Sequence, residues 1–293
     1  MVIDCAGKLL DLSRPAVMGV LNLTPDSFSG DGLLDPQAAC ERALALQAAG
    51  AAVIDIGGES TRPGAKRVVV AEELRRVVPV IERLASRLAV PISIDTRHAE
   101  VMRAAVQAGA GLINDIAALR EPGALDAAAA LGVPVILMHM LGEPGTMQQA
   151  PRYDDVVGEV VEFLDQRMVA CRRAGIADDH VLLDPGFGFG KTVAHNLALL
   201  RDLPRFARFR RPLVVGLSRK SLIGAITGAP VADRLGGSIA LAVLAAERGA
   251  RLLRAHDVEC TVQALSMLNA VQRMPVDVGP MGDVPVTGLD GAI

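Results

Sequence analysis

The chain has 293 residues, which is enough for one large domain or two ordinary ones. Hydrophobic residues make up 51% of it, whereas aromatic residues make up 2% and tryptophan is absent, so a large core must be aliphatic. The formal net charge is −3 with acids and bases interspersed, which excludes the basic face and the aromatic stacking platform of a nucleic-acid-binding protein.

The four cysteines show neither a CxxC motif nor the spacing of a zinc site; they are Cys5, Cys40, Cys171 and Cys260. We therefore expect buried, reduced thiols rather than disulfides. The amino terminus lacks a basic region followed by an apolar segment, and no run approaches the ~20 apolar residues that a membrane span requires. These features predict a soluble, cytoplasmic protein with no membrane partner.

Short apolar runs recur along the chain and end in polar residues. Buried parallel strands have this pattern, and a polar residue at the carboxyl end of such a strand lies where α/β folds place their sites. In chain order, these runs end at or carry Asn22, Asp55, Asp95, Asn114, Asp115, His139, Asp184, Ser218, Lys220, Arg254 and His256. The pattern predicts one site built from many strand ends.

Amphipathic segments of helical period separate these runs. Asp35 and Pro36 begin one that ends near Gly50, and 74–88 forms an apolar stripe in which Pro79 should cause a kink. Further helices are expected over 96–108, 154–175, 233–247 and 258–271. Strand–helix alternation repeated about eight times predicts an α/β fold, a single-domain (β/α)8 barrel over 1–274. The Gly- and Pro-rich segment 275–293 is expected to be a poorly ordered tail.

The segment VLLDPGFGFGK (181–191) argues against the main alternative fold, a doubly wound open sheet. That fold usually carries a GxGxxG dinucleotide fingerprint, whereas 186–190 has the pattern GxGxG. A phosphate-binding P-loop would need glycine at position 185, where Pro185 stands. We therefore exclude nucleotide binding at this loop.

Asp95, Asn114 and Asp184 are short carboxylate or amide side chains at neighbouring strand ends. We expect all three to enter one small cavity. Together they suit a flat heterocycle that carries N–H donors, and Lys220 supplies a cation for its carbonyl oxygen or ring nitrogen. Structural alternatives remain open: Asp95 could cap the next helix, and Asp184 could pair with Lys191 or Lys220. A glycosidase pairing of Asp95 with Asp184 lacks aromatic sugar platforms.

A second group of residues suits an anion. Asn22 could bind a hard cation or a phosphate oxygen, or it could form an Asx turn. The segment 55–64 combines glycines and hydroxyls with Arg62, whose fork matches phosphate oxygens. With Arg62, Arg254 and His256 could gather a polyanion such as diphosphate, although His256 could also be a structural histidine.

Nine segments in order along nearly the whole chain resemble the dihydropteroate synthases of folate biosynthesis, a pterin-binding enzyme family. They are NLTPDSFS (22–29), DIGGESTRPG (55–64), ISIDTR (92–97), INDI (113–116), MHMLGEPGTMQ (138–148), LDPGFGFGK (183–191), GLSRKSLIG (216–224), GGSIA (236–240) and RAHDV (254–258).

The resemblance implies a homodimeric (β/α)8 barrel that requires Mg2+ and joins p-aminobenzoate to 6-hydroxymethyl-7,8-dihydropterin diphosphate, releasing diphosphate. It implies that the pterin is held by Asp95, Asn114, Asp184 and Lys220, and that Asn22 helps to bind the metal. The diphosphate would be held by Asn22, Arg62, Arg254 and His256, and p-aminobenzoate by Phe28, Thr61, Pro63, Phe189 and Ser218. Catalysis would involve Asp95, Lys220, Arg254 and His256.

Sulfonamides, as p-aminobenzoate mimics, are implied ligands. Two alternatives remain within the same barrel: a pterin-dependent methyltransferase and a non-catalytic pterin-binding paralogue. The methyltransferase would have no need of residues arranged for a diphosphate and an aminobenzoate. The paralogue would be expected to show decay in the 22–35 or 57–66 loops, and neither loop shows it.

Overall fold

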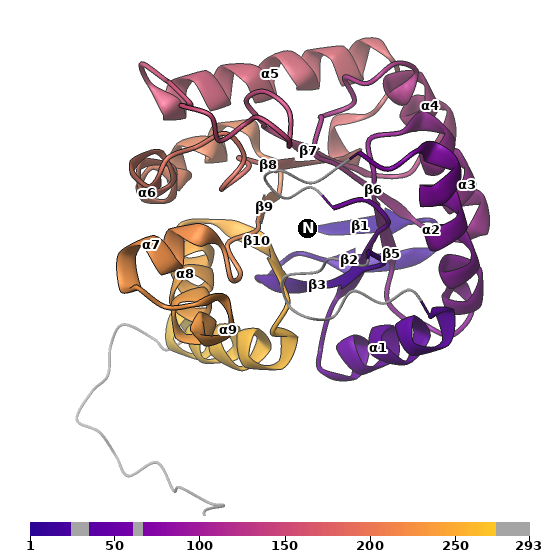
Figure 1. The fold of residues 1–293 in the computed structure, drawn as a ribbon, viewed down its shortest axis with the longest axis horizontal. Helices are drawn as coiled ribbons and strands as arrows, with labels where there is room; N and C mark the ends of the chain where they lie inside the picture. The colour runs from indigo at the N-terminus through magenta and orange to yellow at the C-terminus, as the bar shows by residue number, and fades with distance from the viewer. Residues whose placement is uncertain (25–34, 61–66, 274–293) are drawn as a thin grey trace, which may run out of the picture.

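The computed structural model describes residues 1–24, 35–60 and 67–273. Eight parallel strands close into a barrel in the order β10-β3-β4-β5-β6-β7-β8-β9 (Figure 1). The barrel strands are β3 (Ala16–Asn22), β4 (Val53–Gly57), β5 (Ile92–Asp95), β6 (Leu112–Asp115), β7 (Val135–Met138), β8 (Val181–Asp184), β9 (Leu213–Val215) and β10 (Ala250–Ala255). The (β/α)8 barrel predicted from the alternation of apolar runs and helices is confirmed.

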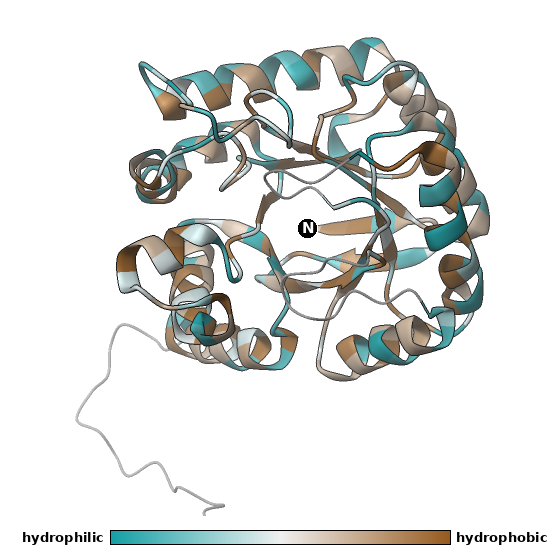
Figure 2. Cartoon of the chain, in the orientation of Figure 1, coloured by the Kyte–Doolittle hydropathy of each residue, from teal (hydrophilic) through white to brown (hydrophobic). Residues whose placement is uncertain are grey.

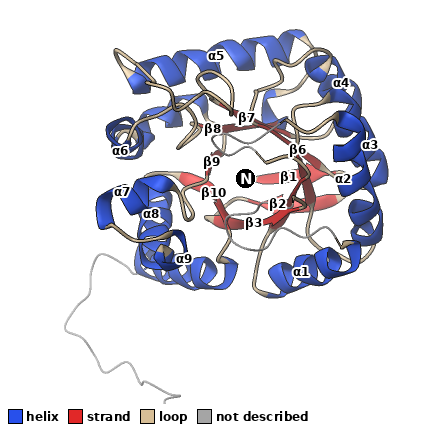
Figure 3. Cartoon of the chain, in the orientation of Figure 1, coloured by secondary structure: helices blue, strands red, loops and turns tan. Residues whose placement is uncertain are grey.

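Helices surround the barrel as a ring (Figure 3). They are α1 (Pro36–Ala48), α2 (Val70–Ala85), α3 (Ala99–Ala108), α4 (Ala124–Leu131), α5 (Val156–Arg173), α6 (Val193–Arg201), α7 (Ser221–Thr227), α8 (Leu235–Glu247) and α9 (Val258–Arg273). Aliphatic side chains fill the layer between these helices and the strands, as the composition requires. Among the described residues, no helix is both long and apolar enough to cross a membrane.

Side-chain caps mark the starts of α1, α5 and α6. The Asp35 carboxylate accepts hydrogen bonds from the backbone N–H groups of Gln37 and Ala38, and Pro36 occupies the first turn of α1. Helix α3 begins after His98, later than the expected start at 96, so Asp95 does not cap it; the Thr96 hydroxyl accepts the His98 N–H at 3.2 Å. Helix α2 continues past Pro79 without interruption.

An antiparallel hairpin precedes the barrel, and it was not predicted from the sequence. Its strands are β1 (Val2–Cys5) and β2 (Lys8–Asp11), which lie inside the ring of helices in Figure 1. The hairpin residues Ile3, Cys5 and Leu10 pack with barrel residues near the starts of the strands, including Met18 and Val53. The hairpin therefore closes the amino-terminal end of the barrel, and the polar strand ends lie at the opposite end. The segment 275–293 lies outside the described residues.

Candidate active site

Strand pairing brings the polar strand ends into one place. In the register of the barrel, Asp95 of β5 pairs with Asn114 of β6, and Asp184 of β8 pairs with Met138 of β7. The side chains of Asp95, Asn114 and Asp184 are less than a tenth exposed. The structure thus gathers the predicted heterocycle-binding residues at the carboxyl end, as the rule for parallel barrels requires.

Arg254 links two buried carboxylates at this end. Its Nε donates to Asp55 Oδ2 at 2.6 Å, and its Nη2 donates to Asp95 Oδ2 at 2.9 Å. The Asn114 amide also donates to Asp55 Oδ2, at 3.2 Å. Asp55 was predicted to end a strand but was given no role in the site. Because it accepts hydrogen bonds from both Arg254 and Asn114, it fixes the positions of both side chains.

Burial shifts the protonation of the carboxylates. Burial and the neighbouring charge of Asp55 raise the pKa of Asp95 to about 8. Burial also raises the pKa of Asp184, against the opposing charge of Lys220. Asp184 accepts the backbone N–H of Gly186 at 2.7 Å, which fixes the loop that follows β8. N–H donors of a bound ligand would stabilise the ionised carboxylates of Asp95 and Asp184. Both acids therefore suit a ligand that carries such donors.

Lys220 closes one side of the site. Its Nζ donates to the carbonyl of Phe187 and lies 4.6 Å from the centre of the Phe189 ring. Burial lowers the pKa of Lys220 to about 8. A side chain at Gly188 would begin 3.1 Å from Lys220 Cδ, and the φ of +81° there is unfavourable for other residues. The glycine-rich loop therefore leaves room for this lysine.

Lys191, which the sequence offered as a possible partner of Asp184, forms a buried pair with His139 instead. Lys191 Nζ donates to His139 Nδ1 at 2.9 Å and to the Gly186 carbonyl at 2.9 Å. Burial lowers the pKa of Lys191 to about 7 and that of His139 to about 2, so His139 is a neutral acceptor. This pair fastens the loop after β8 to the end of β7.

Ser218 and His256 lie together on the loops after β9 and β10. His256 Nδ1 is 3.1 Å from Ser218 Oγ, and the His256 N–H donates to the same oxygen at 3.2 Å. The next residues add an ion pair, in which Arg219 Nε donates to Asp257 Oδ2 at 2.9 Å. Two loops from neighbouring strands are thus joined beside Arg254.

An apolar cluster faces the polar groups around the barrel mouth. It is formed by Ile116, Met138, Met140 and Met147, with Phe189 packed against it. Met138 pairs with Asp184, and Ile116 follows Asn114 by two residues, so the cluster borders the buried acids. A flat ring could contact this apolar wall while its edge meets the acids and the amide.

The predicted metal ligand, Asn22, lies at the end of β3 and is partly exposed. It offers an amide oxygen, which suits a hard cation such as Mg2+ that keeps waters and substrate phosphates as its other ligands. Among the described residues, a separate group of possible ligands comprises Glu59, Glu73 and His98. His98 Nδ1 already contacts Glu73 at 2.6 Å and Arg97 pairs with Glu59, so this group is explained as an ion-pair network.

Four predicted site residues lie outside the described part of the chain. Phe28 falls in 25–34, and Thr61, Arg62 and Pro63 fall in 61–66. The described residues that precede these segments are Thr24 and Ser60, which follow the carboxyl ends of β3 and β4.

The chain matches the family model described as pterin binding enzyme over residues 18–256. It is 52% identical to the dihydropteroate synthase of Escherichia coli K12, over 92% of this chain and 96% of the relative. It is 48% identical to the dihydropteroate synthase of Haemophilus influenzae, over 90% of this chain and 96% of the relative.

Solved structures agree with this assignment. The Yersinia pestis dihydropteroate synthase in complex with a sulfonamide drug has a TM-score of 0.91 and 51% identity, covering 93% of this chain and 99% of that one. The Xanthomonas albilineans enzyme with 4-aminobenzoic acid has a TM-score of 0.88 and 56% identity, covering 94% and 99%. The same organism's enzyme in complex with 7,8-dihydropteroate has a TM-score of 0.85 and 52% identity, covering 94% and 100%. The chain therefore belongs to the pterin-binding enzyme family and, within it, to the dihydropteroate synthases, which condense a pterin with p-aminobenzoate to form dihydropteroate.

Proposed function

We propose that the carboxyl end of this barrel binds dihydropterin diphosphate on the buried acids and releases diphosphate before p-aminobenzoate attacks. The observation that carries this proposal is the convergence of Asp95, Asn114 and Asp184 from three strands, beside Lys220. The pterin ring would donate its amino and ring N–H groups to the acids and the amide. Its carbonyl oxygen or ring nitrogen would accept from Lys220.

Arg254 would hold the diphosphate together with Asn22, Arg62 and His256. A guanidinium has five N–H donors, so its bonds to Asp55 and Asp95 leave donors for a phosphate oxygen. Mg2+ would neutralise the charge that develops on the leaving diphosphate. Asn22 would contribute an oxygen ligand to that ion from the end of β3.

The p-aminobenzoate site is assigned to Ser218 and Phe189, together with Phe28, Thr61 and Pro63 from the segments outside the described residues. Phe189 offers an aromatic face and lies next to Lys220, while Ser218 lies beside His256. These positions lie on loops beyond the strand ends, where an amine could approach the pterin methylene. Sulfonamides would compete for the same place, as p-aminobenzoate mimics.

In the proposed sequence, the bond between the pterin methylene carbon and the diphosphate oxygen breaks first, and both electrons leave with the diphosphate. Arg254 and His256 stabilise that anion. Electrostatic stabilisation of this kind is usually the largest catalytic contribution. Asp95 and Asp184 stabilise the resulting cation, which is delocalised over the pterin. The arylamine nitrogen then bonds to the methylene and loses a proton, and no strong general base is required.

We also propose a homodimer that assembles through α6, α7 and α8. Helix α8 is apolar along most of its length, yet its only buried residues are Ser238, Ala245 and Ala246. Hydrophobic side chains exposed on these helices are Val193, Leu197, Ile226, Leu235 and Leu244. Figure 2 shows hydrophobic residues on the outside of α7. A second copy would cover this surface. All four cysteines are free thiols, three of them buried as expected and Cys260 exposed, and free thiols support a cytoplasmic location.

The test of the proposed reaction is a time course with dihydropterin diphosphate and Mg2+, with and without p-aminobenzoate. Diphosphate release matched one-to-one by dihydropteroate formation would support the synthase reaction. Tight pterin binding without diphosphate release would instead support a non-catalytic pterin-binding protein. Transfer of a methyl group from a methylated pterin would support the methyltransferase alternative.

A further inference from the structure

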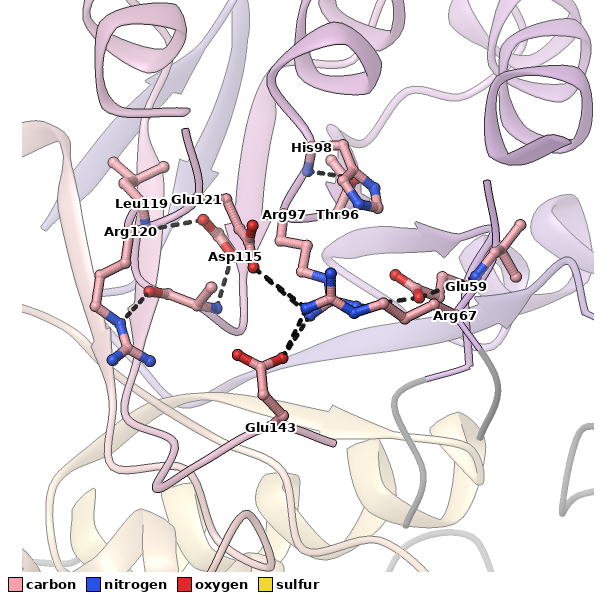
Figure 4. A network of polar contacts seen from close by, with 12 residues as sticks. Glu59, Arg67, Thr96, Arg97, His98, Asp115, Leu119, Arg120, Glu121 and Glu143 are labelled. Carbon is pink, nitrogen blue, oxygen red and sulfur yellow. Dashed lines mark hydrogen bonds and ion pairs between the residues drawn. The ribbon is translucent and has the colours of Figure 1, made fainter. Parts of the chain in front are cut away.

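Arg97 lies at the centre of an ion-pair network at the carboxyl end of the barrel (Figure 4). It follows Asp95 by two residues at the end of β5, and its side chain is only 3% exposed. Its Nη2 donates to Glu59 at 3.2 Å, and its Nη1 donates to Glu143 at 3.0 Å and lies 3.7 Å from Glu121. One planar guanidinium therefore contacts three carboxylates.

The three carboxylates come from three different loops. Glu59 follows β4, Glu121 follows β6 and Glu143 follows β7. Arg67 adds a second cation at the exposed side, where its Nη2 donates to Glu143 at 2.9 Å. Arg97 thus connects the loop after its own strand to the loops after three other strands, across 24 to 46 positions in sequence (97 to 59, 121 and 143).

These loops also carry the outer part of the apolar cluster, whereas Met138, the cluster residue that pairs with Asp184, belongs to strand β7 itself. The loop after β7 that contains Glu143 also supplies Met140 and Met147, and Ile116 leads into the loop that contains Glu121. The loop after β7 is fastened a second time, by a hydrogen bond from the Gln148 amide to the Gly188 carbonyl. Displacement of Glu143 would therefore shift residues that border Phe189.

We infer that Arg97 is a positioning residue for the second substrate. The inference rests on the proposed function, in which the pterin binds first to groups on the strands. Asp95, Asn114 and Asp184 belong to strands whose positions are fixed by the hydrogen bonds of the barrel. An arylamine that arrives later must approach from the solvent side and contact Phe189, which packs against the loop after β7 that Arg97 holds. Loss of the network should then weaken p-aminobenzoate binding far more than pterin binding.

The experiment measures KM for p-aminobenzoate, kcat, and the Kd of the pterin substrate by calorimetry in Arg97→Met, Arg97→Lys and Glu143→Gln. We expect KM for p-aminobenzoate to rise about tenfold or more in Arg97→Met, because bonds between charged groups are lost. Pterin Kd should stay within about threefold. Arg97→Lys should recover part of the loss, since an ammonium keeps the charge but cannot span the carboxylates as a fork.

Two comparisons keep the result interpretable. Glu143 is 54% exposed, so Glu143→Gln removes the charge that pairs with Arg97 and Arg67 without endangering the fold, and it should raise KM in the same direction. Arg75→Met is the matched control, because Arg75 is 71% exposed and pairs with Glu72 on α2, away from the loops. Unchanged KM in folded Arg97→Met and Glu143→Gln, or an equal loss of pterin affinity, would overturn the inference. Absence of turnover in the wild type would instead contradict the proposed function.

Discussion

Arg254 is a single cation that lies between two buried carboxylates. Its bonds to Asp55 and Asp95 are short, and both carboxylates are buried, so neither acid is compensated by bulk water. The raised pKa of Asp95 follows from this imbalance, because one cation cannot neutralise two acids. A bound pterin would add N–H donors where the free protein holds a proton.

The protonation of Asp95 predicts how stability depends on pH. Its pKa is raised from 3.8 to about 8 on folding, so the folded protein binds this proton more tightly than the unfolded chain. The free energy of unfolding should therefore fall as pH rises from about 4 to about 8. Asp95→Asn cannot titrate, so its stability should fall less between about pH 5.5 and about pH 8, by a difference on the order of 3 kcal/mol.

Chemical unfolding of both proteins at about pH 5.5 and about pH 8 measures this difference. The lowered pKa values of Lys191 and Lys220 affect the free energy of unfolding in the opposite direction near pH 7 to 8. Burial disfavours the charged lysines, so the folded protein becomes more stable as they lose a proton. Both proteins share that contribution, so it cancels in the comparison. Identical pH profiles would show that Asp95 is ionised in the folded protein throughout this range.

Several residues of the candidate site could be named from the sequence because their position in the chain predicts where they lie in the barrel. Asp95, Asn114 and Asp184 each end an apolar run, and parallel strand ends converge in a barrel. The role of Asp55 could not be predicted, because its partner Arg254 lies 199 positions away. The partners of Lys191 and Arg97 are hidden for the same reason, since pairing between loops depends on the folded geometry.

The hairpin of β1 and β2 closes the amino-terminal end of the barrel. The backbone of Gly111, at the start of β6, lies so close to the hairpin that an added Cβ would be 2.2 Å from the Cys5 carbonyl oxygen. Lys8 reinforces this junction by donating to the carbonyls of Ala85 and Leu88 at 2.8 and 2.7 Å. The hairpin is thus packed against both the strands and the end of α2.

We predict that Gly111→Ala displaces the hairpin and lowers the free energy of unfolding by about 1–3 kcal/mol, because a backbone oxygen cannot move as a flexible side chain would. Gly145→Ala is the matched control, since no atom lies within 4 Å of its added Cβ. The control should change stability by less than about 0.5 kcal/mol. Equal midpoints for both variants in urea unfolding would refute the proposed packing of β1.

Elements with a strong periodic signal were predicted, and elements without one were missed. The apolar stripe of α2 and the cap of α1 were visible in the sequence, and both helices form. Helix α4 contains four consecutive alanines, 127–130, and so shows no contrast between two faces. The four-residue strands β1 and β2 are too short for their alternation to stand out, and the contacts that stabilise them come from the barrel.

At the scale of the whole molecule, the barrel has three distinct surfaces. The hairpin closes the amino-terminal end, the polar site occupies the carboxyl end, and an exposed apolar surface lies along α6, α7 and α8. An apolar surface of this kind is costly for a monomer in water. A dimer formed there would leave both active sites accessible, because the sides and the carboxyl ends of the barrel are different faces.

Ile226→Glu tests the dimer most simply. Ile226 on α7 is 58% exposed, so the substitution should not disturb the monomer fold, but it would place a charge in the proposed interface. Light scattering after size exclusion should show the wild type as a dimer and the variant as a monomer at micromolar concentration. Met267→Glu is the control, because Met267 is 67% exposed on α9, outside these three helices. A monomeric wild type would contradict the proposed assembly.

The most direct measurement of the central claim is calorimetric titration of wild type and Asp184→Asn with the dihydropterin diphosphate. Asparagine keeps the size of the side chain but loses the charge that should bind the pterin donors. We predict that affinity falls by about 10- to 100-fold, as expected for loss of a hydrogen bond to a charged group, and that turnover falls with it. Equal affinity and retained turnover in a folded Asp184→Asn would contradict the assignment of the buried strand-end acids as the pterin site.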